Sequence, residues 1–121
     1  MANKVVTLLA SAARTATNNS ATKSNPHGRA LRFHVDCTAR AGSASTVFTF
    51  QGYDPVGADY YTLLASAAVT TAATTQYTVG LGSTVTANVS ANVPAPAKYR
   101  VLATHGTADA HTYSVSCEEL E

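Results

Sequence analysis

The sequence contains little charge. Only 12% of its 121 residues are Asp, Glu, Lys or Arg, whereas an average soluble domain contains about 25%. Eight basic and seven acidic residues give a formal net charge of +1, so the whole chain offers no electrostatic argument for binding nucleic acid. A surface with few ions can be buried against another protein without desolvating many charges. The composition therefore favours burial in an assembly.

Large side chains are also scarce. The chain has no tryptophan and only 7% aromatic residues, although 45% of its residues are hydrophobic, because many of these are Ala and Val. A chain of this length fits one domain and buries roughly two thirds of the surface that its unfolded form exposes. We therefore expect a core that depends on a few large anchors. No apolar run reaches the roughly eighteen residues of a membrane-spanning helix, so no membrane association is expected.

The sequence lacks the motifs of catalytic and phosphate-binding sites. Four histidines are present, at positions 27, 34, 105 and 111, but none lies in a nucleophile motif such as Gly-x-Ser-x-Gly. Asp54, Asp59 and Asp109 lie in or next to expected turns, where Asp commonly bonds to the backbone. No glycine-rich loop carries the lysine of a phosphate site. We expect no enzyme, no catalytic residue and no cofactor.

One pair of histidines invites a metal-site interpretation. His105 and His111 flank Gly106 and Asp109, a segment expected to form a hairpin turn. Together with Asp109 they would offer two imidazoles and one carboxylate, fewer ligands than the four of a closed structural zinc site. We therefore expect a surface hairpin without a metal.

Cysteine occurs only twice, as Cys37 and Cys117. The two could form a disulfide in an oxidising compartment, or remain reduced as small buried hydrophobic side chains. The sequence leaves both alternatives open.

The clearest regular pattern lies in residues 31–38. Leu31, Phe33, Val35 and Cys37 alternate with polar residues, which predicts a strand with one buried and one solvated face. Further β-rich runs are expected at residues 45–51, 60–68, 76–79, 84–89, 99–104 and 112–117. Turn-forming Gly and Pro residues separate these runs. The spacing predicts an all-β fold, an antiparallel β-sandwich of the Ig-like or jelly-roll-like kind.

The first part of the chain differs from the rest. Residues 14–28 are polar, carry no bulky apolar side chain and end in the turn-prone Pro26 and Gly28. We therefore divide the chain into residues 1–28, an N-terminal strand followed by a polar extended arm or loop, and residues 29–121, the β-sandwich domain. Up to residue 40 six bases accompany one acid, and after it two bases accompany six acids. These regions could attract one another within a chain or between copies, or the charges could simply be scattered and solvated.

One heptapeptide occurs twice. Thr-Leu-Leu-Ala-Ser-Ala-Ala occupies residues 7–13 and again residues 62–68. The identity does not extend in either direction, so it does not indicate a repeat architecture. It predicts two similar strands in one sandwich.

Tyrosine is the main aromatic residue. The six are Tyr53, Tyr60, Tyr61, Tyr77, Tyr99 and Tyr113. They are suited to core and interface positions, or to a platform that stacks sugar rings. Because Tyr60 and Tyr61 are adjacent, one of them must point outward on a strand. We favour an interface over a sugar site because tyrosine is enriched where proteins meet.

Several short segments resemble small proteins of tailed bacteriophages. These are residues 8–17 (LLASAARTAT), 50–57 (FQGYDPVG), 60–67 (YYTLLASA), 99–109 (YRVLATHGTAD) and 113–115 (YSV). The resemblance covers most of the chain from Leu8 and is to β-sandwich virion proteins, including head decoration (cement) proteins. Such proteins often have Trp where this chain has Tyr99, a change that keeps an aromatic anchor.

The resemblance implies a structural role. A decoration protein binds the outer surface of the phage head and stabilises contacts between major capsid proteins, so the expected partners are the major capsid protein and neighbouring copies of this chain. The expected location is the virion, after synthesis in the host cytoplasm, as a homo-oligomer or bound in a lattice. The candidate partner-binding residues are Lys4, Arg14, Lys23, Arg29, Arg32, Tyr60 and Tyr61. The alternative is a carbohydrate- or receptor-binding module of a phage tail or adhesin, with Tyr53, Tyr60 or Tyr61 as the stacking surface.

Overall fold

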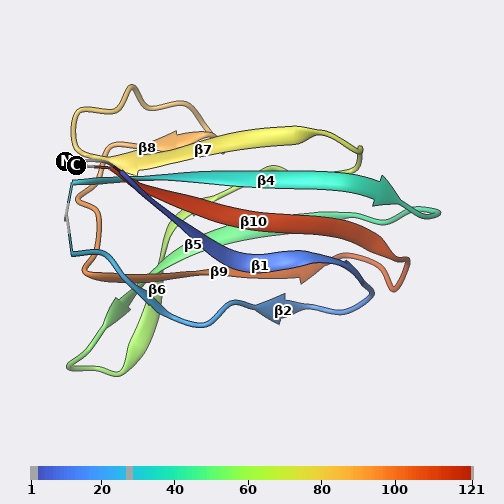
Figure 1. The fold of residues 1–121 in the computed structure, drawn as a ribbon, viewed down its shortest axis with the longest axis horizontal. Coiled ribbons are helices and arrows are strands. Elements are labelled where there is room, and N and C mark those ends of the chain that lie inside the picture. The colour runs from blue at the N-terminus through green and yellow to red at the C-terminus, as the bar shows by residue number, and fades with distance from the viewer. Residues whose placement is uncertain (1–2, 27–28, 121) are drawn as a thin grey trace.

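The chain forms two β-sheets packed face to face (Figure 1). The computed structural model describes residues 3–26 and 29–120. These residues contain no helix, and therefore none that is long and apolar enough to cross a membrane. Sheet A has the order β1 (Lys4–Arg14), β10 (His111–Leu120), β4 (Ala30–Arg40), β7 (Thr74–Gly80) and β8 (Ser90–Ala91). Sheet B has the order β2 (Asn18–Asn19), β9 (Lys98–His105), β5 (Thr46–Asp54) and β6 (Asp59–Ala65), and β3 (Lys23–Ser24) also pairs with β9. The expected all-β sandwich is confirmed; its strand pairs are antiparallel except β7 with β8.

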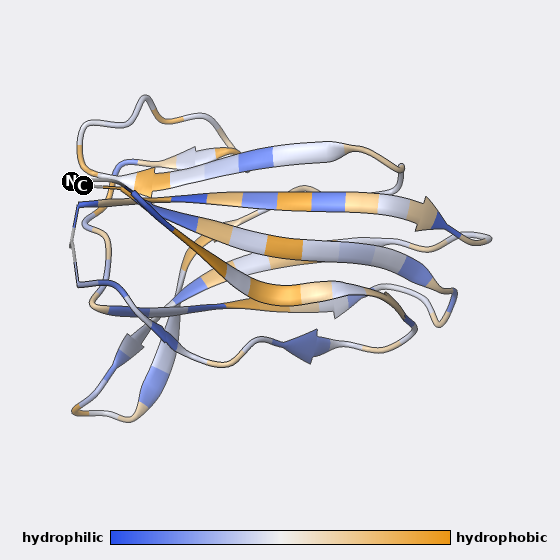
Figure 2. Ribbon diagram, viewed as in Figure 1, coloured by the Kyte–Doolittle hydropathy of each residue, from blue (hydrophilic) through white to orange (hydrophobic). Residues whose placement is uncertain are grey.

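Alternation along β4 builds one half of the core. Leu31, Phe33, Val35 and Cys37 are buried, while the residues between them face solvent or are half-buried, and Figure 2 shows the resulting bands of opposite hydropathy along this strand. The predicted strand is therefore confirmed. Because side chains on a strand alternate between its two faces, this one sequence pattern places four side chains between the sheets.

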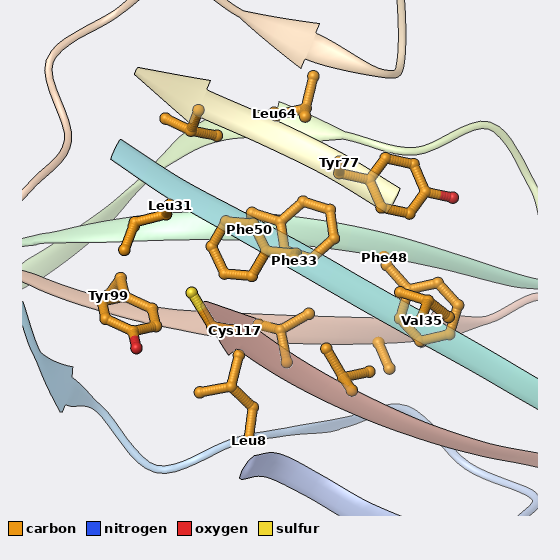
Figure 3. Packing of buried hydrophobic residues seen from close by; sticks show 14 of the residues in the cluster. Leu8, Leu31, Phe33, Val35, Phe48, Phe50, Leu64, Tyr77, Tyr99 and Cys117 are labelled. Atoms are coloured by element: carbon orange, nitrogen blue, oxygen red, sulfur yellow. The ribbon is translucent and has the colours of Figure 1, made fainter. Parts of the chain in front are cut away.

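A small set of aromatic side chains fills the space between the sheets (Figure 3). Phe33 of sheet A stacks on Phe50 of sheet B with ring centroids 4.1 Å apart, and Tyr99 meets Phe33 edge-on at 5.9 Å. Further along, Phe48 and Tyr113 meet edge-on at 5.0 Å. Each pair joins one sheet to the other, so these rings are the large anchors that a core rich in Ala and Val requires.

Two expectations about local structure are wrong. Residues 84–89, expected to be a strand, form a loop, and the strand that follows is the short β8. Asn88 has a positive φ of 61°, a backbone conformation that is incompatible with a continuous strand. Residues 106–109 are not a hairpin turn, because β9 belongs to sheet B and β10 to sheet A. This segment instead carries the chain from one sheet to the other.

The N-terminal segment lies along the edges of its own sandwich. Strand β1 pairs with β10 from Lys4 to Arg14, and β2 and β3 then pair with β9 in the other sheet. Leu8 is buried in the core, and Val6 and Leu9 pack against it. The division at residue 28 stays a prediction, but the segment expected to reach outward as an arm is tied to both sheets within this chain.

The two cysteines do not meet. Cys37 lies opposite Tyr113 and Cys117 opposite Phe33, so they occupy different rungs of the same pair of strands. Both are free and buried. They serve as small hydrophobic side chains of the core, one of the two alternatives that the sequence allowed.

Candidate functional site

The basic residues expected to bind a partner are distributed over both sheets and both ends of β1. Lys4 and Arg14 lie at opposite ends of β1, facing Glu119 and His111 of β10. Lys23 lies on β3 at the edge of sheet B, and Arg29, next to residues that the structure does not describe, is exposed. The register places Lys4 and Arg32 toward the same end of sheet A, whereas Arg14 lies at the other end, so the basic residues of this segment do not all lie together.

Arg14 is engaged in internal contacts. Its guanidinium donates hydrogen bonds to the carbonyl oxygens of Ala10 (2.5 Å), Ala12 (3.3 Å) and Tyr113 (2.7 Å). The same group lies over the Tyr113 ring, 4.7 Å from its centroid. Its side chain covers edge carbonyls of β1, which reduces the strand's capacity to pair with another chain.

Arg32 belongs to the polar outer face of sheet A. Its Nη1 atom lies 3.6 Å from Glu118 Oε1, and His34 Nε2 lies 4.0 Å from the same oxygen. Nearby, Thr74 donates a hydrogen bond of 3.1 Å to Asp36. These partly exposed pairs contribute little to stability, but they leave this face with its charges largely matched.

A buried polar cluster surrounds Tyr113 at one end of the sandwich. Its hydroxyl lies 2.9 Å from Asn18 Nδ2, which donates to it, and 2.7 Å from His105 Nε2. Burial lowers the pKa of His105, and the positive charge of Arg14 lowers that pKa further. Burial also raises the pKa of Tyr113. The cluster therefore consists of neutral groups at neutral pH, apart from Arg14.

His111 holds a second part of the cluster. Its Nδ1 atom lies 2.8 Å from Thr46 Oγ1 and its Nε2 atom 2.7 Å from Cys37 Sγ. A thiol beside an imidazole is also found in cysteine hydrolases, but burial here raises the pKa of Cys37 and lowers the pKa of His111. Both changes oppose formation of a thiolate and an imidazolium, so the contact is suited to structure rather than to nucleophilic attack.

The three residues of the metal-site interpretation have different partners in the structure. His105 and His111 do lie near one another around Tyr113, but Asp109 accepts a hydrogen bond of 2.8 Å from the backbone N–H of Ser43 instead. Within residues 3–26 and 29–120, no three metal-ligating side chains gather, and no pocket is found.

Sequence reasoning missed a buried carboxyl group at the other end of the core. Glu119 is fully buried, and its Oε2 atom accepts a hydrogen bond of 2.7 Å from Tyr99 Oη. Among the residues that the structure describes, none forms a hydrogen bond with its Oε1 atom. Burial raises the pKa of Tyr99, and raises that of the neighbouring Cys117 to about 12. The alternation of β10 with buried residues at every second position could have revealed Glu119 as an inward residue.

The tyrosines at positions 60 and 61 lie on opposite faces of sheet B, as their adjacency requires. Tyr61 lies opposite Gly52, and its ring fills the space where a Cβ of Gly52 would be. Tyr60 lies opposite Tyr53 on the outer face, with ring centroids 4.9 Å apart and the rings inclined at 52°.

Contacts with neighbouring side chains hold Tyr60 on the outer face of sheet B. The guanidinium carbon of Arg100 lies 3.5 Å from the centroid of the Tyr60 ring, and the Tyr60 hydroxyl is hydrogen-bonded to Thr22. Arg100 in turn donates from Nε to Gln51 Oε1 at 2.8 Å. We call Thr22, Gln51, Tyr53, Tyr60 and Arg100 the Tyr60 platform. Arg100 covers one face of the ring, and Tyr60 as a whole is half-buried.

An ordered loop exposes aliphatic side chains. In residues 81–89, between β7 and β8, the exposed fractions are 70% for Leu81, 68% for Val85 and 42% for Val89. We call this segment the aliphatic loop. It is tied to the rest of the chain, because Gly82 N donates to Asn92 Oδ1 (2.9 Å) and Asn88 Nδ2 donates to the Ala65 carbonyl (3.0 Å).

Comparisons with models of protein families, with curated proteins and with solved structures find no match to this chain. The functional assignment therefore depends on the residues themselves. Val5, Val56 and Tyr61 are also exposed, but two surface features of the described chain combine several residues: the aliphatic loop and the Tyr60 platform.

Proposed function

We propose that the protein is a structural virion protein, a decoration subunit that binds the outer surface of a tailed-phage head. In this role it stabilises contacts between neighbouring major capsid proteins. The observation that carries the proposal is the aliphatic loop, which shows three large apolar side chains to solvent on a backbone that is held in place.

Exposed aliphatic residues grouped on one ordered segment are typical of a protein interface. Soluble proteins seldom leave grouped apolar side chains in water unless a partner covers them. Covering Leu81 and Val85 would stabilise a complex by roughly 25 cal/mol for each Å² of apolar surface removed from water. The hydrogen bonds from Gly82 and Asn88 fix the loop in advance, so docking costs little conformational entropy.

The low charge of the chain supports the same proposal. With charged residues at 12% of the sequence and Arg32 and His34 lying beside Glu118 on sheet A, a docking surface can be buried with few ions to desolvate.

Cosedimentation with purified heads that lack the protein tests the proposal. We expect saturation at a fixed number of copies per coat subunit. The double variant Leu81→Ser/Val85→Ser should bind at least about tenfold more weakly, a loss of about 1.4 kcal/mol. The matched control is Val56→Ser, since Val56 is 95% exposed at the β5–β6 turn, outside the aliphatic loop.

Absence of saturable binding by the wild-type chain would contradict the head-binding role. Equal binding by the double variant would instead show that the aliphatic loop is not the docking surface. Deletion of residues 1–28 is a poor probe, because it would remove β1 and leave β10 as an unprotected edge.

A carbohydrate- or receptor-binding module is the second candidate function. The Tyr60 platform favours it, because it presents an aromatic ring on an outer sheet face.

A further inference from the structure

The Tyr60 ring is fixed before any ligand arrives. Three contacts hold it: the Arg100 guanidinium beneath one face, the Thr22 hydroxyl at the phenol oxygen, and Tyr53 at its side. A tyrosine on the surface of a sheet does not need these three contacts in order to be tolerated in solvent. A ring immobilised in this way loses little rotational freedom on binding, which is the condition for an effective stacking surface.

Charge is distributed unevenly around this ring. Lys98 and Arg100 are alternate residues of β9, so both lie on the outer face of sheet B. The register that pairs Gly52 with Tyr99 brings Tyr53 next to Lys98. The aromatic pair is therefore bordered by two cations on the β9 side.

The nearby carboxylates do not neutralise these cations directly. Asp54 accepts a hydrogen bond of 3.0 Å from Val56 N, and Asp59 one of 3.1 Å from Tyr60 N. Both lie at the ends of the β5–β6 turn, where they shape the turn, whereas Lys98 and Arg100 lie on the β9 side of the tyrosine pair.

We propose that the Tyr60 platform binds an acidic sugar, with a pyranose ring of a uronate-containing polysaccharide stacked on the face of the Tyr60 ring that Arg100 does not cover. The carboxylate of the sugar would lie toward Lys98, beside Tyr53 on the outer face, while Arg100 supports the Tyr60 ring from its other face. The Thr22 hydroxyl and the Gln51 amide border the ring and can meet sugar hydroxyl groups. This binding activity is separate from attachment to heads.

The extent of the platform favours a sugar over a nucleic acid. Binding of a single strand needs successive aromatic rings along a basic groove, whereas this face offers one adjacent tyrosine pair and two cations, in a chain with a net charge of +1. One flat ring with neighbouring hydroxyl and amide groups matches the apolar face and polar rim of a single pyranose.

Calorimetric titration of the full chain with a galacturonate hexamer, a neutral galactose hexamer and oligothymidylate tests the proposal. We expect the acidic hexamer to bind and the other two to bind at least about tenfold more weakly. Tyr60→Ala should weaken binding of the acidic hexamer at least about tenfold, and Tyr60→Phe less than about threefold. Lys98→Gln, which leaves the stacked pair intact, should reduce binding of the acidic hexamer only.

Tyr61→Ala is the matched control, since Tyr61 is the neighbouring tyrosine, 47% exposed on the other face of the sheet. Far-ultraviolet circular dichroism checks that each variant is folded. Failure of the wild-type chain to bind the acidic hexamer, equal binding of oligothymidylate, or unchanged binding by folded Tyr60→Ala would each overturn the proposal. Head binding measured on the same variants is independent, so failure of one activity leaves the other testable.

Discussion

The heptapeptide at residues 7–13 and its copy at 62–68 have the same sequence and different burial. The first lies in β1, at the edge of sheet A, and buries its first leucine, Leu8. The second begins in β6, at the edge of sheet B, and buries its second leucine, Leu64. The serines differ more: Ser11 is exposed and Ser66 is buried. Identical local sequence therefore does not determine which side chains enter the core.

Both copies share one irregularity and differ in a second. Each strand has a register shift at its first leucine, since Leu8 and Leu63 have no counterpart in the pairing. In β1 a further shift lies between Leu9 and Ala12, and it turns Ser11 outward. The second copy has no such shift, so alternation from Leu64 carries Ser66 inward. A single change of register moves every following side chain to the other face.

The residue after each copy accounts for this second shift. Arg14 follows the first copy and bonds the carbonyl oxygens of Ala10 and Ala12, which stabilises an irregular edge. Val69 follows the second copy and exchanges backbone hydrogen bonds of 2.8 and 3.2 Å with Thr46, which keeps the chain against sheet B. Contacts of the residue that follows each copy, Arg14 or Val69, therefore favour one register in a strand whose own sequence is compatible with two.

The leucines provide the largest expected difference between the copies. Leu8→Ala and Leu64→Ala should each reduce the free energy of unfolding by about 2–4 kcal/mol, because each removes a buried side chain and leaves a cavity. Leu9→Ala and Leu63→Ala should cost about 1 kcal/mol, since these residues are partly buried. Urea denaturation of the four variants measures this. Equal losses for Leu8→Ala and Leu9→Ala, or for Leu63→Ala and Leu64→Ala, would contradict the assignment of one buried leucine to each copy.

The serines should differ by a smaller amount. Ser66 Oγ accepts a hydrogen bond of 2.9 Å from Phe48 N and donates one of 2.8 Å to the Ala67 carbonyl. Ser66→Ala leaves the buried Phe48 N–H without this acceptor, so we expect a loss of about 1–2 kcal/mol. Ser11→Ala, the matched control, should change stability by less than about 0.5 kcal/mol. A similar loss for both would show that Ser11 has buried contacts too.

Lowering the pH should produce the smallest of the expected differences in stability between the two copies of the heptapeptide. The Tyr113 cluster adjoins Arg14 at the end of the first copy, and burial lowers the pKa of both His105 and His111 in the folded state. The unfolded chain then binds more protons, so stability is complete above the ordinary histidine pKa of about 6.5 and decreases as the pH falls below it. Protonation would add charge beside Arg14 and Arg40.

Hydrogen exchange at about pH 7.5 and about pH 5.5, corrected for intrinsic rates, checks this prediction. We expect faster exchange near residues 10–14 at the lower pH and little change near residues 63–66. His105→Asn should reduce the pH response, because it removes one titrating group while retaining a polar partner for Tyr113. Equal acceleration in both copies would indicate global unfolding instead of local opening.

Particular residues show where sequence reasoning succeeded. The alternation from Leu31 to Cys37 predicted a half-buried strand because a period of two needs no knowledge of the partner strand. The strand predicted at residues 84–89 was wrong, because Thr and Val favour strands but Asn88 adopts a positive φ. The expected hairpin at residues 106–109 failed because a turn-prone sequence does not reveal whether the next strand continues in the same sheet or crosses to the other.

The candidate surfaces were only partly predictable. The adjacency of Tyr60 and Tyr61 required one of them to face outward, but the position of Arg100 beneath Tyr60 depends on a β9–β5 register that is not local. Residues 84–89 of the aliphatic loop were expected to form a strand, because Thr and Val match strand preference.

The sequence by itself determined the all-β class, the inward face of β4 and the dependence of the core on a few aromatic rings, since these follow from composition and periodicity. Tertiary structure alone decided which leucine of each heptapeptide is buried, where Arg14 and Arg100 are placed, and how Tyr113 gathers His105 and His111. These features depend on pairing between strands that are distant in sequence, and the energy of such pairing comes from side chains that meet only in the folded chain.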